Sequence, residues 1–106
     1  MFRLFRRTQA SAAAPAPAPG ARFRAAPSVT CTRDGGRTVL LDHRAGEFYG
    51  LDEVATRLWE LLGGGATLAE AVDALEAEYE APREVLERDA AALAARLVSL
   101  GVLEAA

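Results

Sequence analysis

Short runs of alternating apolar and polar residues, separated by turn-forming residues, characterise the chain from Ser28 to Leu51. Val29 to Arg33 alternates in this way, and Asp34 to Gly36 then predicts a hairpin turn, because glycine accepts the positive φ of tight turns. Arg37 to His43 is expected to return as the second strand, and Glu47 to Leu51 to form the third. The pattern predicts a three-stranded antiparallel meander with Arg37 to His43 at its centre.

After Leu51 the apolar period changes from 2 to about 3.6, which indicates helices. Three are predicted: from the N-cap Asp52 to Gly63, from the capping box of Thr67 and Glu70 to about Tyr79, and from Pro82 to about Leu100, with Gly101 as the cap. The apolar row of the third helix is Leu86, Ala90, Leu93, Leu97 and Leu100. Three strands followed by three helices predict an α+β domain of winged-helix type, with Val102 and Leu103 able to extend at its end.

The first 27 residues differ in texture from the rest. Pro15, Pro17 and Pro19 alternate with alanine, which blocks helix and cannot form a core. We therefore expect residues 1–27 to be a disordered, basic, Ala/Pro-rich arm, and residues 28–106 to be the folded domain.

Net charge also differs between these two parts of the chain. The net charge is -3, but residues 1–27 hold five of the 12 arginines and no acid, which leaves 7 basic and 15 acidic residues, or -8, to residues 28–106. A field of that sign repels phosphate, so nucleic acid is not an expected partner. No apolar run approaches the roughly 20 residues that span a bilayer, and no secretory signal is evident, so we expect a cytoplasmic protein without a membrane partner.

Candidate catalytic and metal-binding residues are few. One Cys31 and one His43 cannot form a closed zinc site, and neither metal nor cofactor is expected. Cys31 is interpreted as a small core or edge residue, and Asp42 and His43 as solvated flanks of a turn. The weaker alternative is a dyad of Cys31 with either Asp42 or His43. The run Gly63 to Gly65 lacks the Lys of a phosphate loop and is read as a helix stop. We do not expect an enzyme.

The third predicted strand is the candidate binding element. Glu47 to Leu51 carries little of the charge or proline that protects an exposed sheet edge, so a peptide could add there as a further strand. The alternative is that the third helix or the N-terminal arm covers this edge.

These segments together resemble the PqqD-like family. The resemblance rests on Leu40 to Asp42, Gly46 to Val54, Leu58 to Leu61, Thr67, Leu68, Glu70, Ala71, Val72, Leu75, Tyr79, Glu87 to Asp89, and Gly101 to Leu103. Members of the family, also called recognition elements of ribosomally made and modified peptides, resemble winged helices but bind peptide.

The resemblance implies that the leader segment of a precursor peptide adds as an antiparallel strand and lies against the third helix. The residues implied are Glu47, Phe48, Tyr49, Gly50 and Leu51 of the strand, and Val85, Arg88, Asp89, Ala92 and Arg96 of the helix. Arg88 and Arg96 would pair with leader acids, the alternative for both being a surface ion pair with Glu84 or Asp89.

By the same resemblance the protein would present the precursor to a separate peptidase, radical enzyme or cyclase, as the stand-alone domain of lasso-peptide pathways does. The competing hypothesis is a winged-helix DNA-binding transcriptional regulator. The third helix sets Arg83, Arg88 and Arg96 against Glu84, Glu87 and Asp89, so it is neutral where a DNA-reading helix should be basic.

Overall fold

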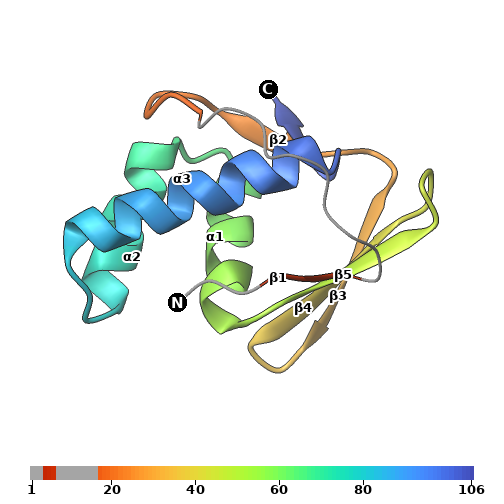
Figure 1. Ribbon diagram of the computed structural model, residues 1–106, viewed down its shortest axis with the longest axis horizontal. Coiled ribbons are helices and arrows are strands. Elements are labelled where there is room, and N and C mark those ends of the chain that lie inside the picture. Colours follow the sequence, from red (N-terminus) through yellow and green to blue (C-terminus); the bar gives the residue numbers. More distant parts are fainter. Residues whose placement is uncertain (1–3, 7–16) are drawn as a thin grey trace.

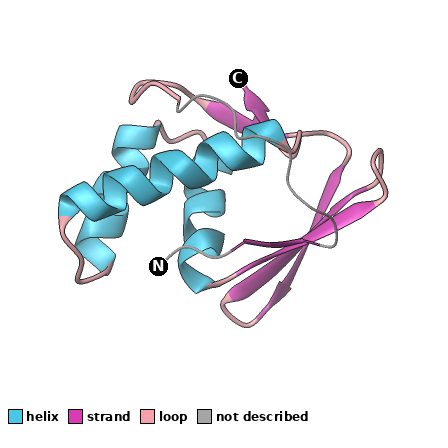
Figure 2. Cartoon of the chain, in the orientation of Figure 1, coloured by secondary structure: helices cyan, strands magenta, loops and turns pink. Residues whose placement is uncertain are grey.

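The computed structural model describes residues 4–6 and 17–106. Its elements, in chain order, are β1 Leu4–Arg6, β2 Phe23–Ala25, β3 Val29–Asp34, β4 Arg37–Asp42, β5 Glu47–Leu51, α1 Glu53–Gly63, α2 Leu68–Glu78, α3 Arg83–Ser99 and β6 Leu103–Ala105. The predicted α+β fold, an antiparallel meander followed by three helices, is confirmed (Figure 1). The helices gather on one side of the molecule and the larger sheet on the other (Figure 2).

The larger sheet has the order β1-β5-β4-β3, with neighbouring strands antiparallel. The predicted meander β3-β4-β5 is therefore present with β4 inside it. The predicted open edge of β5 is not open, because β1 pairs with it. That pairing is one of the two alternatives that the sequence left open.

Inward and outward positions alternate along β4, as the pattern predicts. Thr38, Leu40 and Asp42 are buried, whereas Val39 and Leu41 are exposed. Asp42 was expected to be a solvated turn flank, and this is wrong. Its Oδ1 accepts hydrogen bonds from the Ser28 hydroxyl and from the backbone N–H groups of residues 44 and 45, at 3.2, 3.0 and 3.4 Å, so its burial serves the turn into β5.

The helix ends follow the capping residues that the sequence predicts. The Asp52 side chain accepts from the Ala55 N–H at 2.8 Å, and Thr67 and Glu70 form the reciprocal capping box of α2. α3 begins after Pro82 with no side-chain cap, and it ends before Gly101, whose φ of 79° suits only glycine well.

A second small sheet changes the expected domain boundary. β2 pairs with β6, and Phe23 is only 5% exposed, so packing starts before Ser28. The Arg22 carbonyl accepts from the Ala106 N–H beside this sheet, and the Pro19 carbonyl accepts from the Ala69 N–H of α2, both at 3.0 Å. Within the expected disordered arm, β1 and β2 are thus strands, while residues 1–3 and 7–16 lie outside the described residues.

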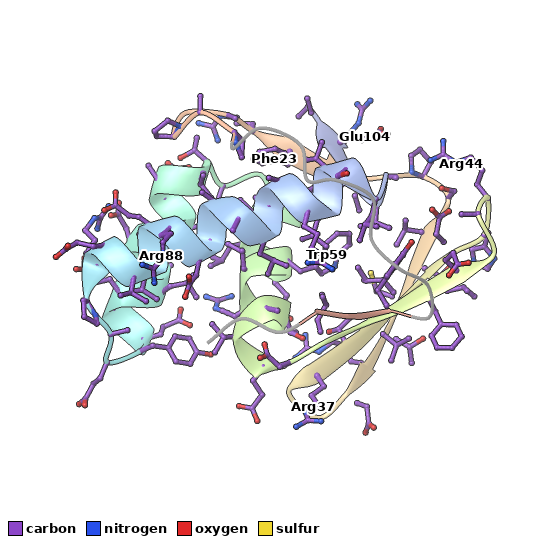
Figure 3. The ribbon with its side chains drawn as sticks, in the orientation of Figure 1. Phe23, Arg37, Arg44, Trp59, Arg88 and Glu104 are labelled. Carbon is purple, nitrogen blue, oxygen red and sulfur yellow. The ribbon has the colours of Figure 1, made fainter. Side chains whose placement is uncertain are left out.

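The core lies between the helices and the inner face of the larger sheet. Phe23 of β2 and Trp59 of α1, both labelled in Figure 3, are 5% and 6% exposed. The buried row predicted for α3 is confirmed at Leu86, Ala90, Leu93 and Leu97, while Leu100 is half-buried. The side chains that are wholly buried in the helices, the sheet and the final segment include Leu40, Leu58, Leu62, Leu75, Leu86, Leu97 and Val102.

Candidate functional site: the β5 edge and the flank of α3

β5 is fixed firmly in place by what surrounds it. Tyr49 and Leu51 point inward and are 4% and 2% exposed, whereas Phe48 points outward. The Leu51 carbonyl accepts from the Thr56 hydroxyl of α1 at 3.3 Å, which joins the strand to the first helix. Because one face and one edge of β5 are held by the core and by β4, its other edge is a rigid template for a further strand.

That other edge carries β1. Leu4, Phe5 and Arg6 lie opposite Leu51, Gly50 and Tyr49 in an antiparallel register. In the view of Figure 1, β1 runs along β5 and below α3. The edge therefore accepts an antiparallel strand at Tyr49 to Leu51.

The implied binding residues of α3 lie mostly on one flank of the helix. Val85, Asp89, Ala92 and Arg96 follow the spacing i, i+4, i+7 and i+11, which is the spacing of one helical stripe. Each precedes a residue of the buried row. Ala92 is exposed and the other three are half-buried, so the stripe forms a shoulder beside the core.

The opposite flank of α3 faces α2. Arg83 forms ion pairs with Asp73 and Glu76 of α2 at 2.7 and 2.9 Å, and these two carboxylates, Asp73 foremost, raise its pKa. Glu87, one turn on from Arg83, also lies near it. By helical spacing, the shoulder with Val85 and Arg96 lies on the side of α3 opposite to Arg83.

The two implied arginines differ in their surroundings. Arg88 lies off the shoulder, its side chain is 73% exposed, and it pairs with Asp89 at 3.5 Å, which is the alternative expected for it (Figure 3). Arg96 is half-buried, and its Nε is buried with no hydrogen-bond partner in the described part of the chain. A buried donor without a partner is costly, so Arg96 is the better prepared of the two to bind a ligand oxygen.

Sequence reasoning missed an apolar patch on the outer face of the sheet. Val39, Leu41 and Phe48 are 42%, 38% and 45% exposed, and Leu41 lies directly opposite Phe48. The signal that could have found it was the alternation itself, which sends every second apolar residue of β4 to the face away from the helices. The patch adjoins the β5 edge at Phe48.

The described residues provide little for catalysis or metal binding. Cys31 is exposed on the edge strand β3, which fits the edge alternative and not the core one. His43 Nε2 lies 2.6 Å from the Thr30 hydroxyl oxygen. Over residues 4–6 and 17–106, no three His, Cys, Asp or Glu side chains are grouped so as to hold a metal ion. Among the helices of that same part, none is long and apolar enough to cross a membrane.

Two solved structures resemble the chain, each with a TM-score of 0.73. One is described as TbiB1 in complex with the TbiA(beta) leader peptide, and it is 34% identical over 76% of this chain and 94% of its own. The other, lasso peptide synthetase B1 complexed with the leader peptide, is 35% identical over 78% of this chain and 98% of its own. No curated protein sequence matches.

The family model for coenzyme PQQ synthesis protein D (PqqD) matches residues 37–103. The match begins with β4 and runs to the start of β6, so it includes β5 and all three helices. It therefore covers both the strand edge and the α3 shoulder described above. This chain belongs to the PqqD family.

Proposed function

We propose that this protein binds the leader segment of a ribosomally synthesised precursor peptide along β5 and presents it to a separate enzyme. The observation that carries the proposal is the likeness, at 34% and 35% identity, to two proteins whose solved structures are leader-peptide complexes. The β5 edge supports it, because that edge accepts an antiparallel strand. The precursor is made on the ribosome, so docking takes place in the cytoplasm.

The leader occupies the space between the β5 edge and the α3 shoulder. Backbone hydrogen bonds to β5 supply affinity without regard to sequence, and side-chain contacts to the shoulder supply selectivity. Ala92 leaves room for an apolar leader side chain, and Arg96 binds a leader carboxylate. The chemistry is done by the partner enzyme, a peptidase, a radical enzyme or a cyclase.

A DNA-binding role is less consistent with α3. Of its three arginines, Arg83 is held by carboxylates of α2 and Arg88 by Asp89, so little positive charge is available to phosphate. The body of the protein also carries a net charge of -8 over residues 28–106, from 7 basic and 15 acidic residues.

The test is a fluorescence-polarisation titration. The probe is the labelled N-terminal half of the precursor encoded by a short reading frame beside this gene, and a labelled DNA duplex is titrated in parallel. Saturable peptide binding with a dissociation constant of about 1 μM or below, with none to DNA, is the expected result. Binding to the duplex alone contradicts the proposal.

A matched pair of variants tests the shoulder. Arg96→Met and Arg88→Met each keep an apolar stem and remove one positive charge. Loss of a charged hydrogen bond at Arg96 is expected to weaken leader binding about tenfold or more, whereas loss of the exposed Arg88 costs less than about fivefold. Equal effects of the two variants rule out the assignment of Arg96 and leave strand addition intact.

A further inference from the structure

The edge assigned to the leader already carries a strand of this same chain. β1 is antiparallel to β5 and covers Tyr49 to Leu51, which are three of the five strand residues implied in leader binding. A strand edge offers one row of N–H and C=O groups, and one strand satisfies that row. Leader and β1 therefore exclude each other at these positions.

We infer that the segment Leu4–Arg6 is an internal ligand of the docking edge, which the leader must displace. The inference rests on the proposed function, because it takes the leader to bind at β5. Residues 7–22 join β1 to β2, so the segment is tethered to the domain whose larger sheet it covers. A tethered strand acts at an effective concentration on the order of 1 mM, far above that of a free peptide.

Charge favours the same contact. Residues 1–27 carry five arginines and no acid, and residues 28–106 carry 7 basic against 15 acidic residues, a net charge of -8. The segment itself contributes Arg6 and is flanked by Arg3 and Arg7. Opposite net charges draw the arm toward the body, most strongly at low ionic strength.

β1 weakens leader binding in proportion to the fraction of molecules in which it covers the edge. Its described residues, Leu4–Arg6, pair with Tyr49 to Leu51. If β1 covers the edge in about nine molecules of ten, the apparent dissociation constant of the leader rises about tenfold. The covered edge is also protected from pairing with another copy when no leader is present.

The experiment compares full-length variants. Leu4→Pro/Phe5→Pro keeps every charge, and neighbouring residues of a strand point their N–H groups to alternate sides, so it removes one that faces β5 in either register. Ala12→Pro/Ala13→Pro is the matched control, with two prolines placed outside β1. Circular dichroism verifies that each variant folds.

Two measurements are made on each protein. Amide hydrogen exchange of the 47–52 segment, without leader, reports whether β1 covers β5, and exchange of β3, at the far edge of the sheet, is the internal reference. Polarisation titration with the labelled leader reports competition. In Leu4→Pro/Phe5→Pro, exchange of 47–52 is expected to be about tenfold faster and leader affinity about tenfold tighter, while the control matches wild type.

Three other outcomes would separate the contact between β1 and β5, the competition with the leader, and the proposed function. Equal exchange in all three proteins overturns the contact between β1 and β5. Faster exchange with unchanged leader affinity overturns the competition, while the proposed function stands. Faster exchange with no leader binding by any of the three proteins refutes the proposed function and with it the role of β1 as a competitor, but it supports the contact itself.

Discussion

Burial of Phe23 indicates that the folded unit begins before Ser28, and the variant Phe23→Ala tests this boundary. The side chain is 5% exposed and belongs to the core, and its strand pairs with β6 at the other end of the chain. Deleting a buried phenylalanine ring costs about 3 to 5 kcal/mol. That is a large part of the roughly 5 to 15 kcal/mol that stabilises a domain of this kind.

The matched control is Phe48→Ala. Phe48 is 45% exposed on the outer face of the sheet, where it lies opposite Leu41. Loss of a cross-strand pair of this kind costs at most about 1 kcal/mol. The two variants remove the same side chain, so the difference in their free energies of unfolding measures burial and not composition.

Urea unfolding followed by circular dichroism at 222 nm gives the free energy of unfolding of both variants. Phe23→Ala is expected to lower the midpoint strongly with little change in slope, and to lower the melting temperature by at least roughly 12 °C. A loss below about 1 kcal/mol, or one equal to that of Phe48→Ala, would refute the inclusion of β2 in the core.

Three further variants test local features by urea unfolding. Thr67→Ala breaks the capping box with Glu70 and should cost about 1 kcal/mol; an unchanged midpoint would show that α2 does not depend on its cap. Gly101→Ala forces an alanine to adopt a φ of 79° and should cost about 1 kcal/mol of stability. An unchanged free energy of unfolding would contradict this expectation. The hydrogen bond that the Arg57 guanidinium donates to the Glu78 carboxylate lowers the pKa of Glu78. The contribution of this bond to folding stability is therefore present above the ordinary glutamate pKa and is lost as pH falls through the lowered pKa. Glu78→Gln should therefore show a shallower loss of stability below about pH 4.3 than wild type, and equal slopes would exclude that contribution.

Features set by neighbours in the sequence could be predicted. The hairpin turn follows from the glycines after Asp34, one of which has a φ of 64°, and the helix starts follow from Asp52 and Thr67. The inward row of α3 follows from the 3.6-residue period. In each case the residues that determine the element lie within it or beside it.

Features that depend on pairing between residues far apart in the sequence could not be predicted. β2 contributes one large apolar residue, Phe23, and its strand exists because β6 lies beside it some 80 positions later. β1 lies in a short arginine-rich segment with no strand pattern of its own, so only the available edge of β5 selects it. Asp42 was misjudged because its residue type suggested solvent, although the alternation from Thr38 through Leu40 already placed it inward.

The site was predicted from resemblance more than from pattern. Alternation and spacing placed β5 and α3, but only the family pattern singled out Arg88 and Arg96, and no pattern distinguished them. The structure distinguishes them by burial, since Arg88 is paired at the surface and the Nε of Arg96 is buried without a partner among the described residues.

Intermolecular nuclear Overhauser effects between the isotope-labelled protein and unlabelled leader would show whether the leader adds as a strand along β5. We expect contacts from leader backbone protons to residues 48–50 in antiparallel order, with the signals of Leu4–Arg6 shifting to those of an unpaired segment. Leader contacts to β3 at the other edge, or to helices without β5, would contradict strand addition.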